Sequence, residues 1–149
     1  MPLNSRMVGE STRDFVHSVD ARWLMAYAAG IGDTNPRLMD TTVGPVPAHP
    51  MFPVCLEWPA ILGSRELPGH ETVSPQEAAR GVHAAHDLHI HRPIVAGERY
   101  TTRAQIVSLR STRSGAAKVT RLDTRDDRGE LVCRTWHQGI SRGVAIEGE

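Results

Sequence analysis

The segment Pro53-Val-Cys-Leu-Glu-Trp-Pro-Ala-Ile-Leu62 decides the fold of this chain of 149 residues. Read as a helix, it carries apolar side chains on every side, and Glu57 is its only charge. A helix that is apolar all round is buried, and Pro53 suits its first position because that position needs no amide hydrogen. Pro59 inside the segment predicts a kink or an end, at a cost of about 3 kcal/mol. We therefore expect one completely buried helix over residues 53–62.

Strand-like segments follow this helix. The pairs Ser114-Gly115 and Arg128-Gly129 mark tight turns, and short turns favour antiparallel neighbours. An antiparallel sheet that curls around a single apolar helix meets both demands. This is the hot-dog architecture, of the α+β class. The candidate strands are residues 82–91, 99–109, 118–124 and 131–140.

The part before the helix predicts one further strand and one further helix. Residues 15–19 suit a short strand, and Asp20 can cap a helix that begins at Ala21 and ends near Gly30 and Gly32. Residues 1–12 are polar and are expected to be loose. We expect a single domain over residues 1–149. Part of the sheet would remain uncovered in a chain of this length, which predicts a dimer.

Composition excludes several classes of function. Apolar residues make up 40%, and 17 basic residues balance 17 acidic ones, so nothing favours binding to nucleic acid or an anionic membrane. Nearly all the positive charge is arginine, which leaves a phosphate-bearing ligand open beside ordinary surface arginines. Two distant cysteines, no secretory leader and no long apolar run predict a cytoplasmic protein that does not span a membrane.

Three segments together resemble the MaoC-like hydratase/dehydratase family of the hot-dog superfamily. The first is Tyr27-Ala-Ala-Gly-Ile-Gly-Asp-Thr-Asn-Pro36, followed by Asp40. The second is Pro47-Ala-His-Pro-Met-Phe52, which opens the buried helix, and the third is His91-Arg-Pro-Ile-Val-Ala-Gly-Glu98. Their order and spacing strengthen what a lone Gly-Asp-x-Asn-Pro would indicate.

The resemblance implies chemistry on an acyl thioester of coenzyme A or acyl carrier protein. Such enzymes add water to, or remove it from, the C2–C3 bond, without a cofactor. The loop aspartate, here Asp33, and a histidine five residues later hold the water, and an amide at the start of the buried helix binds the thioester oxygen. Asn35, Met51 and Phe52 are the candidate substrate-binding residues. A turn role for Asn35 and core packing for Met51 and Phe52 stay open.

Two positions depart from the family pattern. Leu38 stands where the histidine is expected and cannot transfer a proton, and Pro50 has no amide hydrogen to donate. In the family, such a chain resembles the hot-dog half that shapes the acyl tunnel for a catalytic half. The resemblance therefore implies a homodimer or a heterodimer with another hot-dog subunit. Asp33 remains the inherited catalytic residue, unless it only tightens its turn, and His49 is a possible replacement proton carrier, unless it is structural.

Other enzymatic and non-enzymatic functions remain open. A thioesterase or a pathway-specific cyclase on this fold would use Glu57, Asp33 or His49, although Glu57 can also turn to the helix rim or pair with an arginine across a dimer contact. A non-catalytic acyl-binding subunit is the third alternative. Strand alternation places His83, His89 and His91 on one face and His86 on the other, without a matched carboxylate or thiol, so we predict no metal.

Overall fold

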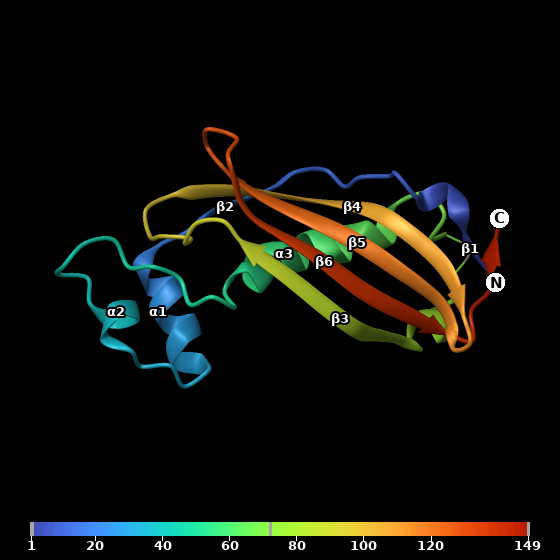
Figure 1. Ribbon diagram of the computed structural model, residues 1–149, viewed down its shortest axis with the longest axis horizontal. Helices are drawn as coiled ribbons and strands as arrows, with labels where there is room; N and C mark the ends of the chain where they lie inside the picture. Colours follow the sequence, from blue (N-terminus) through green and yellow to red (C-terminus); the bar gives the residue numbers. More distant parts are fainter. Residues whose placement is uncertain (1, 72, 149) are drawn as a thin grey trace.

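One antiparallel sheet wraps a central helix, α3 (Pro53–Gly63), in the computed structural model (Figure 1), which describes residues 2–71 and 73–148. The predicted arrangement is confirmed. The five strands lie in the order β2-β4-β5-β6-β3, and each pairs antiparallel with its neighbours. They are β2 (Phe15–Ser18), β3 (Gly81–Ile90), β4 (Arg99–Thr112), β5 (Gly115–Asp126) and β6 (Leu131–Arg142).

Short elements occupy the two ends of the molecule. Helices α1 (Ala21–Gly30) and α2 (Pro36–Met39) lie at one end, and the two termini lie at the other (Figure 1). Asp20 caps α1 as predicted, because its carboxylate accepts from the Trp23 N–H at 2.8 Å. After α3 come η2 (Ser64–Glu66) and α4 (Pro75–Ala78). No helix in the described part of the chain is long and apolar enough to cross a bilayer.

The N-terminal segment is packed, contrary to the expectation of a loose segment over residues 1–12. Strand β1 (Leu3–Asn4) pairs in parallel with β7 (Ile146–Glu147), and η1 (Ser5–Met7) follows it. Leu3 and Met7 are 1% and 0% exposed. Two apolar side chains placed against the C-terminal segment are enough to fix an otherwise polar stretch; Met1 lies outside the described residues.

Helix α3 is buried on one side only, which corrects the expectation of complete burial. Leu56 and Ala60 are fully buried, whereas Trp58 and Leu62 are 50% and 40% exposed. Pro59 neither ends nor interrupts the helix, which runs through it to Gly63. One face of α3 thus leaves apolar side chains that no described residue covers fully.

Strand β3 forms one edge of the sheet and contains a β-bulge. Its pairing with β6 shifts between His83 and Ala85, so Ala84 is left out of the register. Val82 and Ile90 are 43% and 42% exposed on this strand. Within the described chain β3 pairs with β6 alone, so its outer edge can take another strand.

Candidate active site

The end of α1 positions Asp33. Gly32 adopts a positive φ of 81°, which is the left-handed conformation that stops a helix, and the Asp33 N–H donates back to the Ala28 carbonyl at 2.9 Å. The Asp33 side chain then accepts from the Asn35 N–H at 3.0 Å. One carboxylate oxygen is used in this turn, and the side chain is 38% exposed.

A backbone pairing positions His49. Residues 46–48 run beside the 91–98 link, where the Ala48 N–H donates to the Ile94 carbonyl at 2.7 Å and the Ala96 N–H to the Val46 carbonyl at 2.9 Å. His49 follows directly, and its Nδ1 accepts from the Met51 N–H at 3.1 Å. Because Nδ1 accepts, the neutral ring carries its proton on Nε2.

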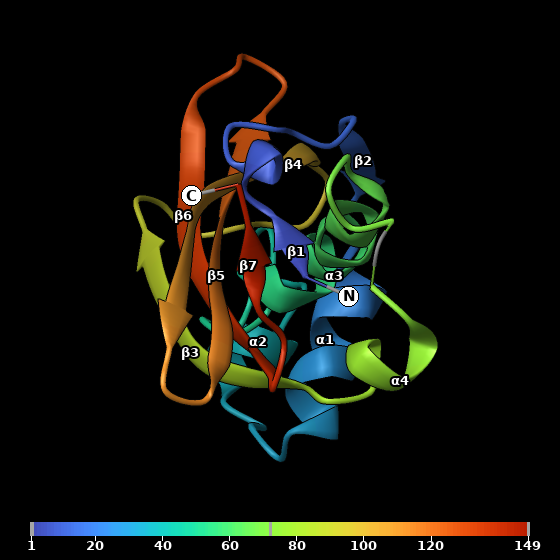
Figure 2. The same ribbon diagram turned by 90° about the vertical axis from the view of Figure 1, so that its right-hand side faces the viewer.

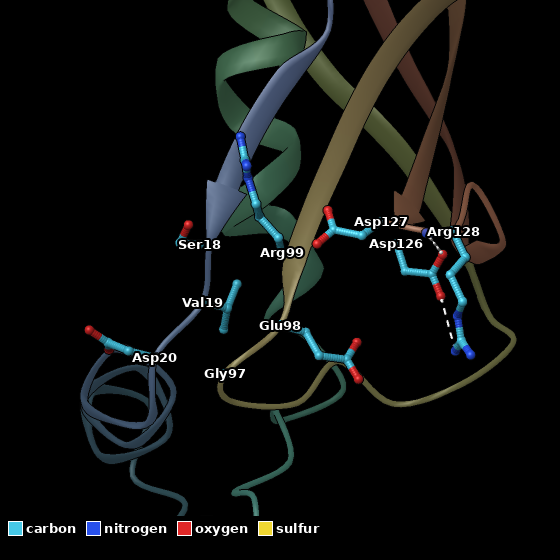
Figure 3. Close-up of a pocket in the computed structure, with 9 residues that line it drawn as sticks. All are labelled: Ser18, Val19, Asp20, Gly97, Glu98, Arg99, Asp126, Asp127 and Arg128. Atoms are coloured by element: carbon cyan, nitrogen blue, oxygen red, sulfur yellow. Dashed lines mark hydrogen bonds and ion pairs between the residues drawn. The ribbon is translucent and has the colours of Figure 1, made fainter.

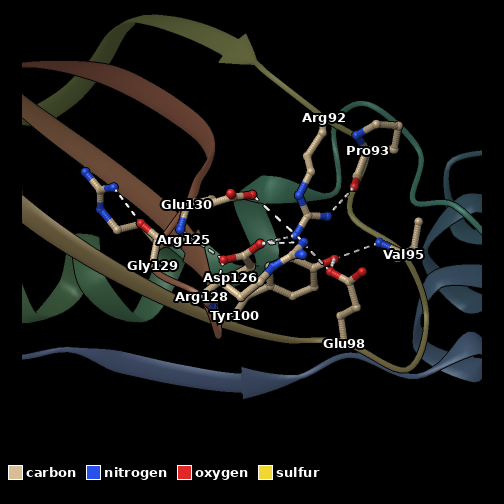
Figure 4. A network of polar contacts seen from close by, with 10 residues as sticks. All are labelled: Arg92, Pro93, Val95, Glu98, Tyr100, Arg125, Asp126, Arg128, Gly129 and Glu130. Carbon is tan, nitrogen blue, oxygen red and sulfur yellow. Dashed lines mark hydrogen bonds and ion pairs between the residues drawn. The ribbon is translucent and has the colours of Figure 1, made fainter.

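An ion-pair network braces the 91–98 link (Figure 4). Arg92 donates to Glu98 at 2.9 Å and to Asp126 at 2.8 Å, and the Tyr100 hydroxyl donates to Glu98 while it accepts from the Val95 N–H. The hydrogen bond from Arg92 lowers the pKa of Asp126. The link that aligns His49 is thereby fastened to the turn between β5 and β6.

Asp33 and His49 meet, although they are distant in sequence. Asp33 Oδ2 lies 3.6 Å from His49 Nε2, and the His49 side chain is 19% exposed. Tyr27, which opens the first of the three family-like segments and was given no role of its own, belongs to the same site. Its hydroxyl donates to the Met51 carbonyl at 3.1 Å, and its ring lies 6.3 Å from that of His49. The contact joins residues 24 positions apart, and the sequence carries no local signal for it.

The first turn of α3 has no free amide hydrogen. Pro50 and Pro53 carry none, the Met51 N–H is bonded to His49 Nδ1, and the Phe52 N–H donates to the His49 carbonyl at 2.8 Å. The next amides follow the same pattern, since those of residues 54 and 55 donate to the carbonyls of residues 51 and 52. An oxyanion at this place would find no unbonded amide hydrogen among residues 50–55.

The other residues singled out in the sequence lie in a helix cap, in the core or at the surface. The Asn35 side chain caps α2 by accepting from the Arg37 N–H at 3.1 Å, and it is exposed. Leu38 is buried at 9% exposure. Phe52 is fully buried, with its ring edge-to-face against Trp23 and Tyr27 at 5.1 and 5.5 Å, so it fills the core. Met51 is 51% exposed and lies beside the Asp33–His49 pair.

Glu57 lies in the core, which corrects the expectation that it turns to the helix rim or pairs with an arginine. It is 0% exposed, accepts a short hydrogen bond from the Thr135 hydroxyl, and has His86 Nε2 3.3 Å from Oε2. The Thr135 partner is 78 residues away in sequence. Burial at this depth keeps Glu57 away from any substrate at the surface.

The bulge in β3 rearranges its histidines. His83 and His86 stack on each other at 5.6 Å, and both lie near His137 of β6, at 4.7 and 6.1 Å between ring centroids. The predicted opposition of His83 and His86 was wrong because strict alternation does not hold across a bulge. Burial, followed by the charges of neighbouring histidines, lowers the pKa of His137 to about 4. Across residues 2–71 and 73–148, no group of three or more His, Cys, Asp or Glu is arranged to hold a metal.

A wide hollow of about 650 Å³ lies between the end of β2 and the turn between β5 and β6 (Figure 3). Its charged groups include Glu98, Asp126 and Arg128. Asp126 is held by Arg92 at 2.8 Å and by Arg128 at 3.6 Å, and its Oδ1 accepts from two turn amides. These contacts close the turn and brace the link described above, so we assign this hollow a structural role.

A model of the FAS1-like dehydratase domain region matches residues 6–135. The chain belongs to this dehydratase family. A UPF0336 protein from Parafrankia sp. (strain EAN1pec) is 31% identical over 148 residues, covering 97% of this chain and 98% of the relative. The family match confirms the resemblance to MaoC-like hot-dog dehydratases that the three sequence segments predicted.

Solved structures share the fold. The HadBC (3R)-hydroxyacyl-ACP dehydratase complex from Mycobacterium tuberculosis matches with a TM-score of 0.74 and 18% identity, covering 90% of this chain and 96% of that one. The R-hydratase PhaJ1 from Pseudomonas aeruginosa matches with a TM-score of 0.66 and 20% identity, covering 91% and 81%. At these identities the similarity establishes the hot-dog fold, as predicted.

Proposed function

We propose that this chain is one subunit of a hot-dog enzyme that hydrates enoyl thioesters or dehydrates 3-hydroxyacyl thioesters of coenzyme A or acyl carrier protein. The observation that carries the proposal is the combination at the start of α3. An accessible aspartate–histidine pair stands there, 3.6 Å apart, beside a helix terminus without a free amide hydrogen. Residues 27–55 thus supply a candidate acid–base pair, and the start of α3 supplies no unbonded amide for an oxyanion.

In the hydration direction, Asp33 acts as the base and His49 orients the water. The Nε2–H of His49 donates to the water oxygen, and Asp33 takes a proton as that oxygen bonds to C3. The C2–C3 double bond becomes an enolate, and the proton held by Asp33 then passes to C2. Atoms and charge balance without a cofactor. The enolate oxygen needs fixed donors in a dry site, and we assign these donors to the partner subunit.

The outer edge of β3 and the exposed side of α3 are where we place the partner. Val82 and Ile90 on the strand and Trp58 and Leu62 on the helix are between 40% and 50% exposed. A ten-residue edge strand with apolar side chains is a template for pairing with a second sheet. Two-chain complexes occur among the structural relatives, as in HadBC and in ChsH1–ChsH2 from Mycobacterium tuberculosis.

The test follows the loss of enoyl absorbance from a trans-2-enoyl thioester. The purified chain is incubated alone and with a hot-dog protein encoded beside its gene. We expect turnover only in the mixture, lowered at least 100-fold by Asp33→Asn, because a positioned acid or base contributes about 10²–10⁴-fold. Asp127→Asn, an exposed aspartate in the turn between β5 and β6, is the matched control and should leave turnover unchanged.

Two outcomes would redirect the proposal. Turnover by the isolated chain would refute the need for a partner. Full turnover of the mixture with Asp33→Asn would leave the chain as a non-catalytic acyl-binding subunit. A thioesterase that attacks through Glu57 is disfavoured because that carboxylate is 0% exposed. We therefore expect no release of free thiol from acyl thioesters.

A further inference from the structure

A second cavity lies at the other end of α3. Its volume is about 310 Å³, at the lower end of the range for small-molecule sites. Trp58 and Ile61 of α3 contribute to its wall, and so do His70 of the connection to β3 and Lys118 of β5. Asp33, His49 and residues 50–52 are not part of its lining. Figure 2 looks at this end of the molecule, where the chain passes from α3 through α4 into β3.

The polar part of the cavity carries a cation without an acidic neighbour. Lys118 Nζ lies 2.9 Å from His70 Nε2. Burial, and then the charges of Lys118 and Arg65, lower the pKa of His70 to about 4, so at pH 7 this ring is neutral and accepts from the ammonium. Burial and Arg65 lower the pKa of Lys118 to about 8, and no carboxylate of the described chain acts to raise it. A charge removed from water is normally paired with an opposite charge, and Lys118 forms no salt bridge with a carboxylate in residues 2–71 and 73–148.

A hydroxyl beside the ammonium also lacks a partner. Thr120 stands two residues after Lys118 on β5, and side chains at that spacing share one face of a strand. It lines the cavity and is 1% exposed, and its Oγ1 makes no hydrogen bond within residues 2–71 and 73–148. An unsatisfied buried hydroxyl costs about 1–3 kcal/mol. The remaining wall is largely apolar, from Trp58, Ile61 and Val73 among others.

We propose that this cavity binds an organic carboxylate with an aliphatic body. One carboxylate oxygen accepts from the Lys118 ammonium and the other from the Thr120 hydroxyl. The aliphatic chain packs against Trp58 and Ile61. A single ammonium and one hydroxyl match the two oxygens and single charge of a carboxylate. This proposal rests on the cavity and not on the chemistry assigned to Asp33 and His49, although Trp58 and Val82 belong both to the cavity wall and to the surface on which we place the partner.

The charged groups around Lys118 predict how binding of the carboxylate depends on pH. The other titratable side chains that line the cavity are Arg65 of η2, His70 of the connection, His83 of β3 and His137 of β6, and all are basic. Glu57, the carboxylate of the neighbouring helix, is bonded to Thr135 and faces His86 instead. Binding should therefore be strong near pH 7 and fade as Lys118 loses its proton above pH 8.

The experiment titrates the whole chain with octanoate by calorimetry, with the tryptophan fluorescence of the chain, to which Trp58 in the cavity wall contributes, as a second reading. Octanol has the same aliphatic body without charge, and we expect it to bind at least tenfold more weakly. Raising the pH from 7 to 9.5 should weaken octanoate at least tenfold. Lys118→Met should remove octanoate binding, and Lys118→Arg should keep it within about threefold. Arg110→Met removes an exposed cation on β4 and is the matched control.

Several results would overturn the proposal. Octanol that binds as tightly as octanoate would show a purely apolar cavity, and octyl phosphate that binds tenfold tighter than octanoate would show a phosphate site. Undiminished octanoate binding by folded Lys118→Met would place the anion elsewhere. If Lys118→Met does not fold, the octanol comparison and the pH series on the unmodified chain decide the question.

Discussion

Two of the carboxylate–histidine pairs among the described residues, Asp33–His49 and Glu57–His86, share their chemistry and differ in their surroundings. The oxygen-to-nitrogen distance is 3.6 Å in Asp33–His49 and 3.3 Å in Glu57–His86. The Asp33 and His49 side chains are 38% and 19% exposed, whereas Glu57 is 0% and His86 18% exposed. Of these two pairs, only Asp33–His49 has a carboxylate that is open to solvent. Burial, more than the identity of the residues, separates a chemical pair from a structural one.

The two pairs also differ in what they connect. Backbone hydrogen bonds contribute to both positions: the Asp33 N–H donates to the Ala28 carbonyl, and the Ala48 N–H before His49 donates to the Ile94 carbonyl. These bonds do not involve the Asp33 or His49 side chains, so we expect the backbone to stay in place when either side chain is replaced. Glu57 instead joins α3 to β6 through Thr135 and to β3 through His86. The buried pair should therefore govern stability and the exposed pair activity.

The largest expected effect is that of Glu57→Ala. This substitution removes the acceptor of the Thr135 hydroxyl and the carboxylate partner of His86, and it leaves a cavity in the core. The free energy of unfolding should therefore fall by about 3 kcal/mol. Urea denaturation measures this. Glu66→Ala, at an exposed position on η2, is the control and should stay within about 0.5 kcal/mol. A loss under 1 kcal/mol for Glu57→Ala would erase the contrast between the pairs.

The second largest effect is expected from acid, which should lower the free energy of unfolding through histidines near the buried pair. His137, beside His86, has a pKa lowered mainly by burial to about 4, and His70 is lowered to about 4 as well. Below pH 6.5 these two histidines are protonated in the unfolded chain, whereas in the folded protein they stay neutral until the pH approaches 4. Stability is therefore fully present above about pH 6.5 and is lost as the pH falls towards 4.

Both rings are partly open to solvent, which reduces the effect to about 2 kcal/mol in total. Urea midpoints at pH 7 and pH 4.5 give the measurement. His137→Gln should remove about half of the pH dependence. An unchanged dependence in that variant would assign the acid response to other groups.

The difference between the pairs also marks what the sequence could predict. The helix in the core, the cap at Asp20 and the antiparallel strands follow from local patterns, and these were confirmed. Burial of Glu57 depends on Thr135, which no local pattern connects to it. The meeting of His83 with His86 depends on a bulge at Ala84, which sequence alternation does not reveal.

The Asp33–His49 meeting was suggested only in part. The sequence placed Asp33 in its turn and His49 near the start of the helix. Their 3.6 Å approach depends on the pairing of residues 46–48 with the 91–98 link, and so on the Arg92 network far along the chain. Local signals thus predicted elements, whereas contacts between distant strands placed the side chains.

A smaller effect is expected for Tyr27→Phe. This change removes the hydrogen bond from the hydroxyl to the Met51 carbonyl and keeps the ring against Phe52, so stability should fall by about 1 kcal/mol. The Met51 amide holds His49 Nδ1, so the imidazole should become more mobile. Nuclear magnetic resonance of the His49 ring together with urea unfolding tests both points. A His49 ring signal identical to that of the unmodified chain would separate Tyr27 from the site.

The smallest effect on stability is expected for Asp33→Asn, and this result sharpens the comparison most. Asparagine keeps an oxygen that can accept from the Asn35 N–H, and the side chain is 38% exposed, so the free energy of unfolding should change by no more than about 0.5 kcal/mol. The same substitution should lower turnover of the complex at least 100-fold. A large loss of turnover with little change in stability is the result expected for a solvent-accessible catalytic pair. A loss of 2 kcal/mol or more in urea would mean that Asp33, like Glu57, is there to hold the fold.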